Sequence, residues 1–270
     1  MTDIVFIHGL FMTPRSWDSW VSWFSERGYR CHAPAWPGHT GDPAALRASP
    51  PEVLRTLTLG EVIAAHRALI ATLDAKPIVI GHSMGGLVAQ RLLDDDLVAA
   101  AVAIDPAPPK GIFVLSWSFL RANLPVINPL AGNRPYQFSL KGFHYAFCNT
   151  LTVEETRLIF DAHVVPEARN VARGTIGSDA AIDFDRPHKP LLIIAGERDH
   201  IVPWRLNRKN FQAYRHAGST RSFHVMPGRD HFLCGQPGWE QVAEVAEGFL
   251  RDHVSRALPA GASSSATATT

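Results

Sequence analysis

The segment Gly81-His82-Ser83-Met84-Gly85 places a serine between two glycines, directly after an apolar run at residues 77–80. This pattern between a strand and a helix is typical of a sharp turn that exposes a nucleophilic serine. Glycines are expected there because a Cβ would collide with neighbouring backbone. The helix that follows directs its positive end at the oxyanion formed on attack. The sequence therefore predicts Ser83 as a nucleophile and the N–H of Met84 as one oxyanion donor.

A serine hydroxyl needs a base that removes its proton and a third group that orients the base. Among thirteen histidines, His231 is the best candidate because it lies in the loop 228–232, between the last strand pattern and the final helix pattern. Loops of this kind follow the carboxyl ends of parallel strands, where ligands bind. The nearest competitors are His8 and His82, which we expect to brace their own turns, and His144.

Two aspartates compete for the orienting role. Asp199 and Asp105 each come just past a buried strand pattern. The chain order of nucleophile, acid and base allows either carboxyl. The family resemblance given below favours Asp199, and Asp105 remains the alternative. We expect Asp230 to be solvated, since it precedes His231 and points the other way along the chain.

Elements that would position these residues can be read from the hydrophobic pattern. Short β-branched apolar runs alternate with amphipathic stretches of helix length, which predicts an α/β fold: a mostly parallel sheet of about six strands flanked by helices. The expected strands are residues 4–7, 29–33, 77–80, 99–104, 190–195 and 221–225. The expected helices include residues 13–28, 59–73 and 239–254.

The alternation stops between residues 106 and about 187, where aromatic residues and prolines are frequent. Thr152 and Glu155 form a capping box for a helix over Val153–His163. We predict a helical cap at residues 107–186 over one end of the sheet, inserted into a core domain of residues 1–106 and 187–256. A small second core without a functional role is the alternative. Residues 257–270 are small and polar and predict a disordered tail.

Four motifs resemble those of the α/β-hydrolase family, over about residues 3–254. The motifs are His8-Gly9-Leu10-Phe11, the segment 81–86, the Gly-x-x-Asp-x-x-Val-Pro run at 196–203, and Gly228-Arg-Asp-His231. The early start at the His-Gly strand is similar to the compact methyl-esterase and hydroxynitrile-lyase branch. The resemblance implies a serine hydrolase with the triad Ser83, Asp199 and His231. It assigns the second oxyanion donor to Leu10, with Phe11 as the alternative.

The expected substrate is a small to medium uncharged ester or lactone, because the site should be apolar and partly enclosed. We expect Phe11, Trp117, Phe143 and Phe232 among its contacts. Dehalogenases and epoxide hydrolases of this kind need aspartate at the nucleophile, and Ser83 argues against both. Hydroxynitrile lyases carry lysine after the catalytic histidine, where this chain has Phe232. Carbon–carbon bond hydrolases, perhydrolases and small-molecule receptors of the same fold remain open.

Composition limits the partners. The net charge is +1 with no basic stripe, so no nucleic acid is expected, and no apolar run is long enough to predict a membrane segment. Cys31, Cys148 and Cys234 are too few and too scattered for a disulfide framework, and together with the absence of a signal peptide pattern this suggests a cytoplasmic location. No metal or organic cofactor is implied, and the oligomeric state stays open.

Overall fold

Six parallel strands form the centre of the computed structural model, which describes residues 1–254. Their order across the sheet is β2-β1-β3-β4-β5-β6. The strands are β1 (Asp3–Ile7), β2 (Arg30–His32), β3 (Ile78–His82), β4 (Ala100–Ile104), β5 (Leu191–Gly196) and β6 (Arg221–Met226). All six expected strands are present within two residues of their expected ends, so the predicted α/β class is confirmed. The expected tail at 257–270 lies outside the described residues.

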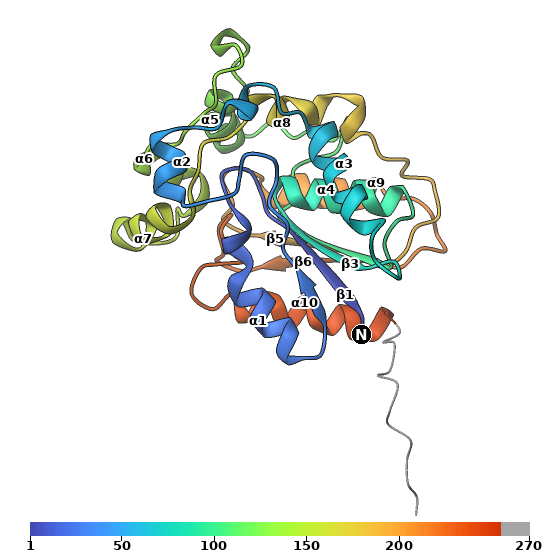
Figure 1. Ribbon diagram of the computed structural model, residues 1–270. Helices are drawn as coiled ribbons and strands as arrows, with labels where there is room; N and C mark the ends of the chain where they lie inside the picture. The colour runs from blue at the N-terminus through green and yellow to red at the C-terminus, as the bar shows by residue number, and fades with distance from the viewer. Residues whose placement is uncertain (255–270) are drawn as a thin grey trace, which may run out of the picture.

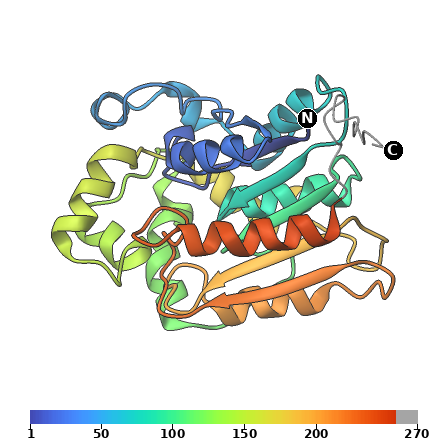
Figure 2. The same ribbon diagram turned by 90° about the horizontal axis from the view of Figure 1, so that it is seen from below.

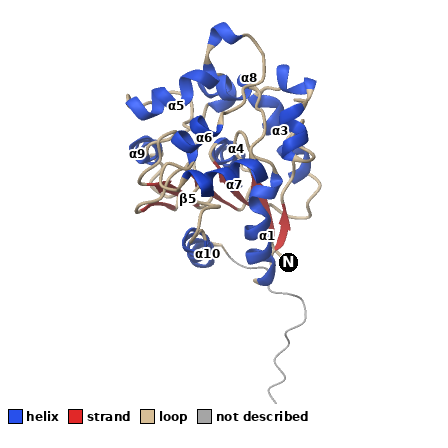
Figure 3. Cartoon of the chain, turned by 90° about the vertical axis from the view of Figure 1, so that its left-hand side faces the viewer, coloured by secondary structure: helices blue, strands red, loops and turns tan. Residues whose placement is uncertain are grey.

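Helices cover both faces of the sheet (Figure 1). On one face lie α1 (Asp18–Glu26) and α10 (Glu240–His253), and on the other lie α3 (Leu59–Ile70), α4 (Met84–Asp94) and α9 (Trp204–Ala213). A cartoon coloured by secondary structure shows the strands enclosed between these helices (Figure 3). A further helix, α2 (Pro43–Ala48), begins at Asp42, whose carboxylate accepts the N–H groups of Ala44 and Ala45.

The core is divided by the sheet because neighbouring residues of a strand point to opposite faces. In β1, Ile4 and Phe6 pack against the α1 and α10 side, whereas Val5 and Ile7 pack against the α3 and α4 side. Both sets are fully buried. This burial on two sides explains why the strands read as continuous apolar runs.

The segment 107–186 connects β4 to β5 and is mostly helical. It contains α5 (Trp117–Ile127), α6 (Leu140–Phe147), α7 (Val153–His163) and α8 (Arg169–Arg173). Helix α7 has the bounds expected from sequence, and the Thr152–Glu155 capping box is formed. In Figure 2 the strand arrows point toward the yellow-green helices of this segment. The segment therefore lies at the carboxyl ends of the strands.

Candidate functional site

The turn at Ser83 has the backbone that a nucleophile elbow requires. Ser83 follows β3, precedes α4, and adopts φ 55° and ψ −118°, a left-handed conformation that only glycine adopts readily. A Cβ on Gly81 would collide with the carbonyl of Gly85, and one on Gly85 would collide with the carbonyl of Ile7. These close approaches account for the two glycines of the motif.

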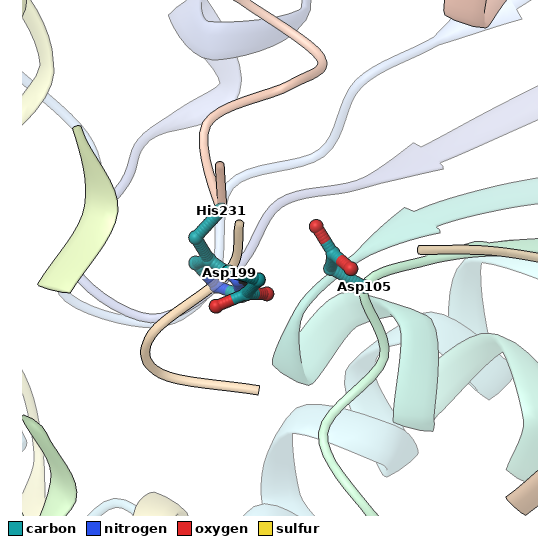
Figure 4. A group of neighbouring side chains, drawn as sticks. All are labelled: Asp105, Asp199 and His231. Carbon is teal, nitrogen blue, oxygen red and sulfur yellow. Dashed lines mark hydrogen bonds and ion pairs between the residues drawn. The ribbon is translucent and has the colours of Figure 1, made fainter. Parts of the chain in front are cut away.

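His231 and Asp199 form a buried hydrogen-bonded pair. Nδ1 of His231 lies 2.6 Å from Oδ2 of Asp199, and neither side chain is exposed. The other carboxylate oxygen, Oδ1, accepts the N–H groups of Ile201 at 2.7 Å and Val202 at 2.8 Å. Burial raises the pKa of Asp199, and these two donors oppose the rise. The carboxyl is thus held in one orientation with an oxygen directed at the imidazole (Figure 4).

The second ring nitrogen of His231, Nε2, makes no hydrogen bond to the described residues. This nitrogen is buried. Burial lowers the pKa of this histidine, so the imidazole is neutral at physiological pH. With Nδ1 donating to Asp199, Nε2 carries the lone pair and is able to accept a proton.

Two residues, His82 and Phe147, link the turn of Ser83 to His231. Nε2 of His82 lies 2.7 Å from the backbone oxygen of His231, and the two rings are 4.7 Å apart between centroids. Phe147 contacts the imidazole of His231 at 4.7 Å and lines the same cavity as Ser83. No hydrogen bond joins Ser83 to His231 within residues 1–254, and such contacts are often long before substrate binds.

The loop after β1 lies directly against the serine. A Cβ on Gly9 would come within 2.9 Å of the Cβ of Ser83. Leu10, Ser83 and Met84 line one cavity, and neither Leu10 nor Met84 donates a backbone hydrogen bond in the described part of the chain. The N–H of Phe11 is occupied, since it donates to Glu167 at 3.1 Å. This geometry favours Leu10 over Phe11 as the second donor.

Asp105 lies beside the pair without bonding to His231. It is fully buried at the end of β4, has φ 41°, and its Oδ1 accepts the N–H of Gly196 at 2.8 Å. Burial and the neighbouring charge of Asp199 raise the pKa of Asp105 well above its usual range. We therefore assign the proton of this carboxyl pair to Asp105.

One cluster could in principle hold a metal ion among the residues that the structure describes. One ligand atom each from Asp105, Asp199 and His231 lie within 4.8 Å of one another (Figure 4). Nδ1 of His231 and Oδ2 of Asp199 are already hydrogen-bonded to each other. We therefore describe the three residues as a hydrogen-bonded acid–base pair, His231 and Asp199, beside the protonated Asp105.

An apolar cavity of about 390 Å³ opens at Ser83. Its polar side chains are Ser83, Asn123 and Thr175, and no charged side chain lines it in the described range. The remaining lining residues come from the β1 loop, the start of α4, the 107–186 segment and the loop after β5: Leu10, Met84, Ala107, Pro108, Pro109, Gly111, Ile112, Phe113, Phe119, Ile127, Phe147, Ala172, Ile176, Ile201 and Val202.

None of the four aromatic residues expected to contact substrate lines this cavity. Phe11 and Phe143 are fully buried and pack against other aromatic rings. Phe232 is buried against Gly235, and Trp117 is 78% exposed. The structure instead brings aliphatic residues to the cavity, for which the sequence offers no periodic or motif signal.

The other candidates occupy supporting positions. Nδ1 of His8 bonds to the oxygen of Gly9, and His144 bonds to Thr156. The expectation for Asp230 is wrong: it is fully buried, and its carboxylate accepts the N–H and hydroxyl of Thr150. These bonds connect the loop of His231 to the 107–186 segment.

Comparison with known proteins identifies relatives over most of the chain. The model of the alpha/beta hydrolase family matches residues 4–247. A pyrethroid hydrolase from Sphingobium wenxiniae is 27% identical over 228 residues, covering 77% of this chain and 75% of that protein.

Solved structures share the fold. A monoacylglycerol lipase from Paleococcus ferrophilus superposes with a TM-score of 0.66 at 20% identity, covering 93% of this chain and 94% of the other. The methylesterase MES16 from Arabidopsis superposes with a TM-score of 0.66 at 13% identity, covering 92% and 98%. The expected family resemblance is confirmed. No described helix is long and apolar enough to cross a membrane.

Proposed function

We propose that this chain, which belongs to the alpha/beta hydrolase family, is a serine hydrolase that cleaves a carboxylic ester or lactone through an acyl-enzyme intermediate. The observation that carries the proposal is the buried His231–Asp199 pair, whose Nε2 has no partner among the described residues and which the contact of His82 with the His231 backbone oxygen joins to the strained Ser83 turn. The distant likeness to a pyrethroid hydrolase supports ester chemistry.

The first half of the reaction forms an ester on the enzyme. The Oγ of Ser83 attacks the substrate carbonyl carbon while its proton moves to Nε2 of His231, and Asp199 stabilises the resulting imidazolium. The carbonyl oxygen becomes an oxyanion that accepts the N–H groups of Leu10 and Met84, donors of a kind worth roughly 10²–10³ in rate each. Collapse breaks the bond to the leaving alcohol, which takes the proton from His231.

The second half releases the acid. His231 removes a proton from a water molecule, and the hydroxide attacks the acyl carbon bound to Ser83. The second oxyanion forms in the same place and collapses, so that Ser83 recovers its proton from His231. Every proton that moves does so through one imidazole nitrogen, which explains why that atom lacks a fixed partner.

The substrate body is apolar and uncharged. The cavity beside Ser83 is lined mainly by aliphatic and aromatic carbon, and an ionised group placed there would lose its hydration without a counter-charge. Residues 107–186 act as a cap that supplies much of this lining. A panel of short-chain, long-chain and charged aryl esters tests this, since preferred turnover of charged esters would refute it.

A fluorophosphonate probe tests the proposed chemistry. An active serine hydrolase is labelled stoichiometrically at Ser83, and Ser83→Ala abolishes the labelling. Intact protein that remains unlabelled would contradict the proposal and favour a small-molecule receptor of the same fold. Labelled protein without turnover on esters and lactones would move the substrate class to carbon–carbon bond cleavage or perhydrolysis.

A further inference from the structure

A buried carboxyl group from the 107–186 segment holds the loop that follows β1. Glu167 lies between α7 and α8 and has no exposed surface. Its Oε2 accepts the N–H of Phe11 at 3.1 Å and bonds to Nε2 of His39 at 3.0 Å. Its Oε1 accepts the N–H of Ala168 at 2.7 Å. All of these partners are themselves buried.

Phe11 is fixed on both sides of its peptide unit. Its N–H is bound by Glu167, and its carbonyl accepts the N–H of Val165 at 3.0 Å. The Phe11 ring meets the ring of Tyr136 edge-on, and Tyr136 is joined to Glu167 by two backbone hydrogen bonds of 2.8 Å. The 107–186 segment therefore holds Phe11 by its backbone, through Val165 and Glu167, and by its side chain, through Tyr136.

These contacts hold Phe11 in an unfavourable backbone conformation. Phe11 has φ 67°, in the left-handed region that a bulky residue avoids at a cost of order 1–3 kcal/mol. Without a partner for its N–H, the loop would relax toward an extended conformation. That relaxation would rotate the peptide between Leu10 and Phe11, and with it the adjacent peptide that carries the N–H of Leu10.

We propose that Glu167 is a positioning residue for the oxyanion site: by holding Phe11, its carboxyl fixes the N–H of the neighbouring Leu10 beside Ser83. This inference rests on the proposed hydrolase function. Glu167 does not line the cavity and touches no reacting atom. It acts through Phe11, and His39 keeps the carboxyl in place.

Burying a carboxyl group costs free energy unless every oxygen is paired. Both oxygens of Glu167 are paired, and the charge of Glu167 raises the pKa of His39 even though burial lowers it. An apolar residue would fill the same space without this cost. A requirement for fixed loop geometry explains why the chain retains a carboxyl here.

Glu167→Gln tests the role with little change of shape. Either orientation of the amide turns its NH₂ group toward the N–H of Phe11 or of Ala168, so one acceptor is lost. We expect kcat on an aryl ester to fall about 10- to 100-fold, less than or near the loss of one oxyanion donor. The KM should stay within about twofold, because the cavity is untouched.

An exposed glutamate of the same segment provides the matched control. Glu155→Gln alters the α7 capping box and has no contact with the β1 loop. It should leave kcat unchanged. Thermal unfolding of both variants separates a loss of folded protein from a loss of rate. A fall in kcat of equal size in both variants would overturn the inference.

A boronic acid inhibitor reports on the oxyanion site directly, since its tetrahedral adduct on the serine carries a negative oxygen. Glu167→Gln should weaken boronate inhibition by about the same factor as kcat, whereas a merely structural role would leave the ratio of boronate Ki to substrate KM unchanged. Wild-type protein that fails to hydrolyse esters would overturn the proposed function. Active wild type with an equally active, equally inhibited Glu167→Gln would overturn only the role of Glu167.

Discussion

Nε2 of His82 lies 2.7 Å from the backbone oxygen of His231, 149 positions downstream. The contact joins the residue before the proposed nucleophile, Ser83, to the proposed base. Burial lowers the pKa of His82 well below its usual range, so the ring is neutral and donates from Nε2. A bond from the end of β3 thus holds the loop of His231 against the turn of Ser83.

Removing the hydrogen bond between His82 and the backbone oxygen of His231 should lower activity without removing a catalytic group. His82→Ala is expected to lower kcat about 10²-fold, the size of effect that a misplacement of about 1 Å produces. His82→Gln retains a donor and should keep most of the rate. Steady-state kinetics on an aryl ester checks this, and wild-type kcat in His82→Ala would exclude a positioning role.

Asparagine substitutions at the two carboxyls should differ sharply. In Asp199→Asn the one amide oxygen is needed by the N–H groups of Ile201 and Val202, which turns the NH₂ group toward Nδ1 of His231. The change should lower kcat by at least about 10²-fold. Asp105→Asn should cost little, since Asp105 makes no hydrogen bond to His231 and the amide has nearly the shape of the protonated carboxyl. Comparing kcat for the two variants decides the assignment. The opposite order of losses would move the orienting role to Asp105.

Filling the cavity should change chain-length preference. Ala172 lies in its lining, and Ala172→Leu adds three carbon atoms to the space beside Ser83. The KM for a long-chain aryl ester should rise at least fivefold, about 1 kcal/mol of lost apolar contact. The short-chain ester serves as the internal control, and its KM should not change. Equal changes for both esters would show that substrate binds elsewhere.

A buried histidine that does not line the cavity should make stability fall in acid. His66 is buried in α3, where Nδ1 bonds to the Val62 carbonyl, and burial lowers its pKa. Below the unfolded pKa of about 6.5, the unfolded chain binds a proton that the folded chain refuses, so the unfolding free energy falls as pH falls. The slope for one such group reaches about 1.4 kcal/mol per pH unit.

Urea unfolding at pH 7.5 and pH 5.5 measures this term. The wild type should lose more stability between the two values than His66→Leu, which has no proton to bind at this position. Turnover of an aryl ester, measured at pH 7.5, should be the same for both proteins. An identical pH dependence for the two proteins would show that His66 accepts its proton in the folded state.

Strands were predictable because burial on both faces leaves a continuous apolar run. Helix α9 was not, since its buried side includes Asn207 and Asn210, and Asn210 donates to Gln90 instead of packing against carbon. Helix α2 is a single short stretch of six residues, below the length that shows a period.

In the candidate site too, the residues with a motif signal were predictable and those without one were not. Ser83, Asp199 and His231 each lie in a sequence motif that marks a turn. The structure brings the carboxyls of Asp105 and Asp199 and the imidazole of His231 together. Of the aromatic residues expected as substrate contacts, Phe11 and Phe143 pack against Phe138 instead, because ring–ring contact buries them more fully than an open cavity would. Trp117 is exposed. Glu167 has no motif, and its only signal was a carboxyl inside an apolar stretch.

The central claim is that Ser83 and His231 act as one unit on an ester carbonyl. Measuring kcat for Ser83→Ala, His231→Ala and the double variant on the same ester tests it most directly. Each single variant should lose about 10⁴- to 10⁶-fold and the double variant little more, because either loss removes the same step. Losses that multiply in the double variant would contradict the account.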